Sequence, residues 1–217
     1  MKASTTKKNR LKGLYAITDS ILMPDDEQLI AQTELAILGG ARIVQYRDKT
    51  TDQAKRLRQA AKLAELCHQH GVLLLINDDM SLAQASGADG VHLGQADGAV
   101  PQARQLLGES AIIGVTCHDQ LSLAEQALHE GADYIAFGAF FRSKTKPHAS
   151  PAPLSLLSDA KQQFDCPIVA IGGITVDNAH QTIAHGANMI AVIHALFTAP
   201  NVKQQAQLFT ALFAANS

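Results

Sequence analysis

Short apolar segments alternate with helical patterns along almost the whole chain, and this alternation limits the folds that the sequence can adopt. The segments are nearly continuous apolar runs, which is typical of parallel strands covered on both faces. Eight runs lie in 217 residues, and eight strand–helix units of this length predict a single (β/α)8 barrel, the TIM barrel of the α/β class. A doubly wound open sheet is the alternative. The predicted strands are Leu14–Thr18, Ile43–Tyr46, Val72–Asn77, Gly90–Leu93, Ile112–Thr116, Tyr134–Phe137, Ile168–Ile171 and Met189–Ile193.

A glycine–alanine pair recurs before every second predicted strand and supports the count of eight. Successive pairs are 47, 44 and 55 residues apart, and each interval is long enough for two strand–helix units. We expect each glycine to end a helix in the left-handed conformation, and the alanine to let the chain pass tightly into the next strand. The glycines are Gly40, Gly87, Gly131 and Gly186.

The chain carries no Pro/Ser-rich linker and no block of like charges that would divide it. We therefore predict one catalytic barrel domain over residues 13–217, preceded by a flexible, basic tail over residues 1–12. Predicted helix N-caps are Thr51 or Asp52, Asp79 and Thr175, because short polar side chains accept hydrogen bonds from the first free N–H groups.

Composition excludes several classes of protein. The formal net charge is −2 from 18 basic and 20 acidic residues, so no global basic field indicates a nucleic-acid or anionic-membrane partner. The longest apolar runs are far shorter than the roughly 20 residues of a membrane helix. The polar N-terminus has no apolar core of a signal peptide. The three cysteines show no CxxC spacing, which favours a reducing compartment, and we expect a cytoplasmic protein.

Polar residues at the carboxyl ends of the strands are the candidate site, because TIM-barrel active sites form there. Arg47 and Lys49 lie two residues apart beside Gln45, so we expect the three side chains to project together. The segment after the sixth strand repeats this spacing with two lysines between hydroxyl residues. Cations and hydroxyls on one rim predict a phosphate-binding site, and solvated surface charge is the alternative. The residues of the second group are Ser143, Lys144, Thr145 and Lys146.

Two carboxylates end neighbouring strands and predict a metal site. Asp78 and Asp97 follow the third and fourth strands, and oxygen ligands near phosphate-binding cations suit Mg²⁺. A zinc site is disfavoured because the chain has no HxxxH motif and no cysteine cluster. Gly172 and Gly173 follow the seventh strand and allow backbone N–H groups to approach a second phosphate, although a tight turn explains them equally.

Several segments, taken together and in order, resemble the thiamine phosphate synthase family from Leu14 to Phe197. The resemblance implies a TIM-barrel transferase that joins hydroxymethylpyrimidine diphosphate to hydroxyethylthiazole phosphate and releases diphosphate. The segments are Leu14-Tyr-Ala-Ile-Thr-Asp19, Val44-Gln-Tyr-Arg-Asp-Lys49, Ile76-Asn-Asp-Asp79, Asp89-Gly-Val-His-Leu-Gly-Gln-Ala-Asp97, Gly138 to Lys146, and Val169-Ala-Ile-Gly-Gly-Ile174.

The resemblance also implies roles for individual residues. Asp78 and Asp97 bind Mg²⁺, and the residues expected to act in catalysis are Arg47, Lys49, Thr116 and Lys146. The pyrimidine diphosphate is held by Gln45, Arg47, Lys49, Asn77, Thr116 and Lys146, and the thiazole phosphate by Ser143, Thr145, Gly173, Ile193 and His194. The chain departs from the family pattern at four positions. Ala139 stands where the family usually has proline, Ser143 where it has threonine, and Thr116 and His194 where it has serine.

Two other functions remain open at this point. A thiazole tautomerase is a relative with the same fold and a histidine in the segment that matches Gly114-Val-Thr-Cys-His118. It needs no diphosphate site, so it would not require both aspartates beside the cations. A non-catalytic protein that binds thiamine precursors is the second alternative. The partners expected are small-molecule substrates, without nucleic acid or membrane, and whether the chain forms a homo-oligomer is left open.

Overall fold

The computed structural model describes residues 7–142 and 151–214, and its eight parallel strands close into a barrel. Each strand pairs with the next in sequence, and β8 pairs with β1, so the TIM-barrel prediction is confirmed and the open sheet is wrong. Five predicted strands have the observed bounds, and the other three differ by one residue at one or both ends. The strands are β1 Gly13–Ile17, β2 Ile43–Tyr46, β3 Leu73–Asn77, β4 Gly90–Leu93, β5 Ile112–Thr116, β6 Tyr134–Phe137, β7 Ile168–Ile171 and β8 Met189–Val192.

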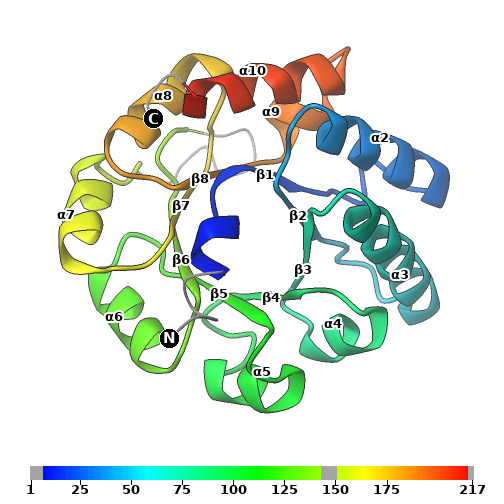
Figure 1. Cartoon of the computed structure of the whole chain (residues 1–217), viewed down its shortest axis with the longest axis horizontal. Coiled ribbons are helices and arrows are strands. Elements are labelled where there is room, and N and C mark those ends of the chain that lie inside the picture. Colours follow the sequence, from blue (N-terminus) through cyan, green and yellow to red (C-terminus); the bar gives the residue numbers. More distant parts are fainter. Residues whose placement is uncertain (1–6, 143–150, 215–217) are drawn as a thin grey trace.

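Helices surround the barrel and cover the outer face of its strands (Figure 1). No helix in residues 7–142 and 151–214 is long and apolar enough to cross a membrane, and the cytoplasmic location stays a prediction. The helices described are α2 Asp26–Leu38, α3 Gln53–Gln69, α4 Met80–Ser86, α5 Val100–Leu107, α6 Leu121–His129, α7 Ser155–Gln163, α8 Val176–Ala184, α9 His194–Phe197 and α10 Val202–Ala214.

The predicted helix ends follow from local hydrogen bonding. Asp52 and Asp79 each accept a hydrogen bond from the N–H group three residues ahead, which caps α3 and α4. Thr175 begins α8 in a reciprocal capping box with Asn178. The four repeated glycines before β2, β4, β6 and β8 all adopt positive φ, as the repeat predicts: Gly40 104°, Gly87 74°, Gly131 100° and Gly186 107°.

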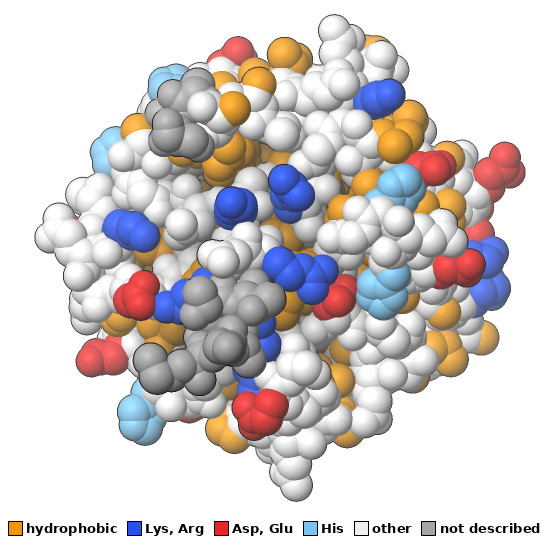
Figure 2. Space-filling view, in the orientation of Figure 1, with side chains coloured by type: hydrophobic (Ala, Val, Ile, Leu, Met, Phe, Trp, Pro, Cys, Tyr) orange, Lys and Arg blue, Asp and Glu red, His pale blue; other side chains and the backbone are white. Residues whose placement is uncertain are grey.

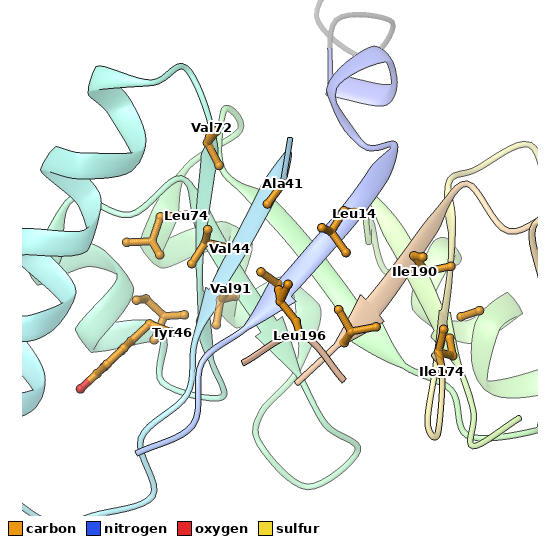
Figure 3. Packing of buried hydrophobic residues seen from close by; sticks show 14 of the residues in the cluster. Leu14, Ala41, Val44, Tyr46, Val72, Leu74, Val91, Ile174, Ile190 and Leu196 are labelled. Carbon is orange, nitrogen blue, oxygen red and sulfur yellow. The ribbon is translucent and has the colours of Figure 1, made fainter. Parts of the chain in front are cut away.

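Two separate apolar clusters stabilise the barrel. The outer one joins the strands to the helices and includes Val44, Leu74 and Val91, whose side chains point away from the barrel axis (Figure 3). The inner one fills the barrel with residues such as Leu75 and Tyr134, both completely buried. Both faces of each strand are therefore apolar, which explains why the strands are continuous apolar runs in the sequence.

Residues 7–12 differ from the prediction of a flexible tail over residues 1–12, and residues 1–6 lie outside the part of the chain that the structure describes. Residues 7–10 form a helical turn, and Leu11 joins the inner cluster with 1% of its surface exposed. Lys7 Nζ donates to Glu109 O, Ala111 O and Asp133 Oδ1 at 2.6–3.1 Å. The segment lies across the end of the barrel where the strands begin, and Lys and Arg side chains gather around it on this face (Figure 2). The burial of Leu11 and the ion pair of Lys7 with Asp133 explain the difference, and neither can be seen in a polar sequence.

Candidate active site

At the opposite end of the barrel, where the strands finish, Asp78 joins a group of polar side chains from neighbouring strands. Its Oδ2 atom accepts hydrogen bonds from Lys49 Nζ, with which it forms an ion pair, and from Asn77 Nδ2 at 2.6 Å. Asp78 has φ 64°, a left-handed conformation that aspartate adopts more readily than most residues. Its N–H group donates to His92 O at 2.8 Å, which ties this turn to β4. The structure therefore brings together Lys49, Asn77 and Asp78, as the sequence predicts.

Asp97 completes a pair of carboxylates with Asp78. Its Oδ2 atom accepts a hydrogen bond from Gly94 N at 3.0 Å, which fixes the turn after β4. Partial desolvation raises the pKa of the Asp97 carboxyl, and the Asp78 carboxylate within hydrogen-bonding reach raises it further. Two carboxylates placed this close repel each other unless a proton or a cation lies between them.

This donor set fits Mg²⁺. The ion is usually bound by one or two carboxylates, with water and substrate phosphates completing the coordination. Among the residues that the structure describes, no three or more His, Cys, Asp or Glu side chains form a metal-binding group, so a site made only of protein ligands is absent there. Asp78 and Asp97 can supply the carboxylates, and a bound diphosphate can supply further oxygens.

Arg47 is held on the side of β2 that faces β1. Its N–H group donates to the hydroxyl of Thr18 at 2.9 Å, and its guanidinium lies 3.9 Å from Asp19 Oδ2. Thr18 is buried, whereas the Arg47 side chain keeps 36% of its surface exposed. The two cations therefore lie at one rim but lean in different directions, Arg47 toward β1 and Lys49 toward β3.

Gln45 and Thr116 end a chain of buried hydrogen bonds that crosses the barrel. Gln45 Nε2 donates to the Tyr15 hydroxyl at 2.7 Å, and the Tyr15 and Tyr134 hydroxyls are 3.0 Å apart. The Tyr134 hydroxyl is 2.8 Å from His92 Nδ1, and His92 Nε2 is 2.8 Å from Thr116 Oγ1. Sequence analysis predicts the two end residues as substrate ligands but misses the three residues between them.

Burial determines the ionisation of these three residues. It lowers the pKa of His92 to about 4, so the imidazole is neutral near pH 7. It also raises the pKa values of Tyr15 and Tyr134 well above the ordinary value, so both hydroxyls keep their protons. The chain is therefore a series of neutral hydrogen-bonding groups. These three residues could have been found in the sequence as polar side chains at strand positions that face the barrel interior. Finding them requires the strand register, because the register decides which positions face inward.

The glycine pair after β7 packs against the segment that follows β6. A Cβ atom on Gly172 would lie 2.3 Å from Ala139 Cβ, and one on Gly173 would lie 2.5 Å from Phe141 O. Phe141 N donates to Gly172 O at 3.0 Å, and Asn178 Nδ2 donates to Gly173 O at 3.0 Å. Close backbone packing explains both glycines, and a phosphate role for Gly173 stays a prediction.

The remaining predicted site residues fall into two groups. Ile193 precedes the short helix α9 at the end of β8, and His194 is the exposed first residue of that helix. Both lie on the rim that carries the carboxylates, in agreement with their predicted location, while their ligand role stays untested. Four further predicted residues lie outside the residues that the structure describes: Ser143, Lys144, Thr145 and Lys146.

Residues 14–196 match the protein family described as thiamine monophosphate synthase. The chain belongs to this family. It is 53% identical to the thiamine-phosphate synthase of Saccharophagus degradans over 199 residues, which cover 92% of each protein. It is 56% identical to that of Alcanivorax borkumensis over 189 residues, or 87% of each. The family membership that the sequence motifs indicate is thus confirmed.

One solved structure agrees with the family assignment, and a second shares only the fold. The thiamine phosphate pyrophosphorylase from Pyrococcus furiosus superposes with a TM-score of 0.86 at 31% identity, covering 96% of this chain and 98% of that one. An (S)-3-O-geranylgeranylglyceryl phosphate synthase from Thermoplasma acidophilum gives a TM-score of 0.69 at 16% identity, covering 96% of each chain. The second similarity shows the barrel fold alone, whereas the first lies within the thiamine monophosphate synthase family.

Proposed function

We propose that the chain is a thiamine phosphate synthase that condenses 4-amino-2-methyl-5-(diphosphooxymethyl)pyrimidine with 4-methyl-5-(2-phosphoethyl)thiazole. The observation that carries this proposal is the pair of carboxylates, Asp78 and Asp97, beside Lys49 on the rim of a barrel from this family. A thiazole tautomerase has no need of such a diphosphate site. More than half of the residues are identical to two curated synthases over most of the chain, which supports the same assignment.

We propose that Asp78 and Asp97 hold Mg²⁺ together with the diphosphate of the substrate. When bound, the ion would neutralise phosphate oxygens and so favour departure of the diphosphate. Lys49 already contacts Asp78, so its ammonium group lies where it can pass from the carboxylate to a phosphate oxygen. Asn77 holds the Asp78 carboxylate through its amide and fixes its orientation.

In the reaction, the bond between the pyrimidine methylene carbon and the diphosphate oxygen breaks, and the thiazole nitrogen forms a new bond to that carbon. The electron pair of the broken bond leaves with the diphosphate. An electron-rich aminopyrimidine stabilises positive charge on the methylene carbon, so a dissociative, cation-like transition state is favoured. Arg47, Lys49 and Lys146 then stabilise the charge that develops on the leaving oxygen, a contribution that can reach several kcal/mol.

Holding both substrates on one rim supplies the rest of the catalysis by orientation. We propose that Gln45, Asn77 and Thr116 contact the pyrimidine substrate. The thiazole phosphate would lie toward the other side of the rim, against Gly173, Ile193, His194, Ser143 and Thr145. No proton has to be transferred in this scheme, which agrees with the neutral His92 and the protonated tyrosines inside the barrel.

The deciding experiment measures diphosphate release by the purified protein with both substrates, with each substrate alone, and with or without Mg²⁺. A synthase releases diphosphate at a sustained rate only when both substrates and Mg²⁺ are present. A protein that only binds precursors shows saturable binding without release. Tautomerase activity without diphosphate release would overturn the proposal.

The metal site is tested separately with Asp78→Ala and Asp97→Ala. Each should raise the Mg²⁺ concentration needed for half-maximal rate and should lower the rate at saturating Mg²⁺, because one ligand is lost. Asp79→Ala is the matched control, since Asp79 caps α4 and forms an ion pair with Arg56. It should cost about 1 kcal/mol of stability without changing the Mg²⁺ dependence. Unchanged Mg²⁺ dependence in both of the first two variants would refute the metal assignment.

A further inference from the structure

We infer that His92, Tyr15 and Tyr134 are positioning residues that fix which hydrogen-bonding atom Gln45 and Thr116 present to the pyrimidine substrate. None of the three is assigned a role by the sequence motifs, and all three lie inside the barrel below the site. The inference rests on the proposed function in one respect, the identity of the substrate that the two end residues contact.

The direction of the hydrogen bonds follows from the donor at one end. Gln45 Nε2 can only donate, so the Tyr15 oxygen accepts from it and the Tyr15 proton needs another acceptor. The Tyr134 hydroxyl is the acceptor within reach, at 3.0 Å. Tyr134 therefore donates its own proton to His92 Nδ1, which must be unprotonated. With Gln45 Nε2 facing Tyr15, only this direction gives every buried hydroxyl proton an acceptor.

The tautomer of His92 follows in turn. A neutral imidazole with an unprotonated Nδ1 carries its proton on Nε2, so His92 donates to Thr116 Oγ1 at 2.8 Å. The Thr116 oxygen accepts this bond, and its own proton is left to donate elsewhere. At the other end, Gln45 Oε1 has no partner among the described residues. The chain of bonds thus leaves one acceptor at Gln45 and one donor at Thr116.

Packing prevents the chain from rearranging. The His92 and Tyr134 rings stack with centroids 5.6 Å apart, and the Tyr15 and Tyr134 rings meet edge to face at 6.2 Å. Tyr15 and Tyr134 are at most 1% exposed. Gly114 provides the space for the Tyr134 ring, since a Cβ atom there would lie 1.9 Å from its Cζ atom. Rotating any of these rings away from its hydrogen-bond partner would disrupt this packing and therefore cost free energy.

An aminopyrimidine matches the two ends of the chain. Its exocyclic amino group donates hydrogen bonds and suits the Gln45 oxygen, whereas its ring nitrogens accept and suit the Thr116 hydroxyl. The opposite tautomer of His92 would accept the Thr116 proton and leave only lone pairs facing a ring nitrogen. His92 therefore contributes to the selection of this ring without touching it.

The first test reads the tautomer directly and needs no activity. Two-bond ¹H–¹⁵N spectra of the protein labelled at histidine distinguish protonated from unprotonated ring nitrogens, and loss of one signal set in His92→Gln assigns His92. Nε2–H is expected in the wild type, and Tyr134→Phe should give a mixture because Nδ1 loses its donor. A wild-type protein with the proton on Nδ1 of His92 would overturn the inference.

The second test measures the KM for the pyrimidine diphosphate. Tyr134→Phe should raise it about tenfold with little change in the KM for the thiazole phosphate, because Thr116 loses its preferred orientation. In a Thr116→Ala background the same substitution should have a smaller effect, because only the path through Tyr15 to Gln45 remains. Tyr46→Phe is the matched control, since its buried hydroxyl bonds to Gln59 Oε1 at 2.8 Å on the outside of the barrel.

The outcomes separate the inference from the proposed function. An equal rise in KM in the Thr116→Ala background, or in Tyr46→Phe, would show a merely structural effect and overturn the positioning role. A wild-type protein without diphosphate release but with the Nε2–H tautomer would refute the proposed function and retain the hydrogen-bond chain. A wild-type enzyme that is active with His92 in the Nδ1–H form would retain the proposed function and refute the hydrogen-bond chain.

Discussion

Replacing Gly114 with alanine tests the packing inside the barrel most directly. The added Cβ atom would lie 1.9, 2.3 and 2.4 Å from three carbons of the Tyr134 ring. Carbon atoms pack at about 3.5–4.0 Å, so the ring would have to retreat by about 1.6 Å. Tyr134 is completely buried, and its hydroxyl is held at 3.0 Å from Tyr15 and 2.8 Å from His92. A movement of this size breaks both hydrogen bonds.

The expected loss of stability is the sum of three contributions. Overpacking a core costs about 1–3 kcal/mol, and each broken hydrogen bond costs about 1 kcal/mol net. Replacing glycine recovers about 0.4–1 kcal/mol through the entropy of the unfolded chain. We expect a net loss of about 3 kcal/mol, and for a chain of this length a melting temperature lower by about 10 °C.

The assay is thermal and urea unfolding followed by circular dichroism. Gly131→Ala is the control, because nothing lies within 4 Å of its added Cβ atom while its φ of 100° strains any side chain. It should cost about 1–2 kcal/mol through the backbone alone. In a Tyr134→Leu background, where the ring is absent, the cost of Gly114→Ala should fall below about 1 kcal/mol. A Gly114→Ala protein that melts within 2 °C of the wild type would refute this account, where 2 °C is about 0.5–1 kcal/mol.

Three further predictions concern the site and the thiols. Lys146→Ala should lower turnover at saturating substrates by about 10²-fold if Lys146 stabilises the departing diphosphate, and a raised KM with normal turnover would limit it to binding. His194→Ala should weaken the affinity for the thiazole phosphate, measured calorimetrically, because the imidazole can donate a hydrogen bond to a phosphate oxygen. An unchanged affinity would exclude that contact. Burial raises the pKa values of three thiols to about 11–12, so they should resist Ellman's reagent at pH 8 until the protein is unfolded: Cys67, Cys117 and Cys166.

The sequence predicts the strands well because their pattern follows from burial on both faces. Ile43–Tyr46 and Gly90–Leu93 begin and end where the apolar runs do. The sequence also predicts the polar residues at the carboxyl ends of the strands, because each of them directly follows an apolar run. Lys49 and Asp78 were expected at one rim for this reason, and the structure joins them in an ion pair.

The same double burial conceals what lies inside the barrel. A strand with two apolar faces gives no sign of which residues point inward, so Tyr15, His92 and Tyr134 look like ordinary parts of apolar runs. Their hydrogen bonds join positions up to 119 residues apart, and only the strand register brings them together. The order of residues 7–12 cannot be predicted from the sequence for a related reason, because the partners of Lys7 lie more than 100 residues away.

The pairing of β1 with β8 has a consequence for the order in which the chain folds. Gly13 pairs with Met189 and Ala16 with Val192, so the first strand to leave the ribosome waits for the last one. Contacts this distant in sequence form slowly, because a long loop must be closed before they stabilise anything. Until then β1 and the most recently formed strand present unpaired edges, which are the parts of a sheet that associate with other chains. A nascent chain that stops before β8 is therefore the species that most needs a chaperone, although it already contains most of the residues of the site.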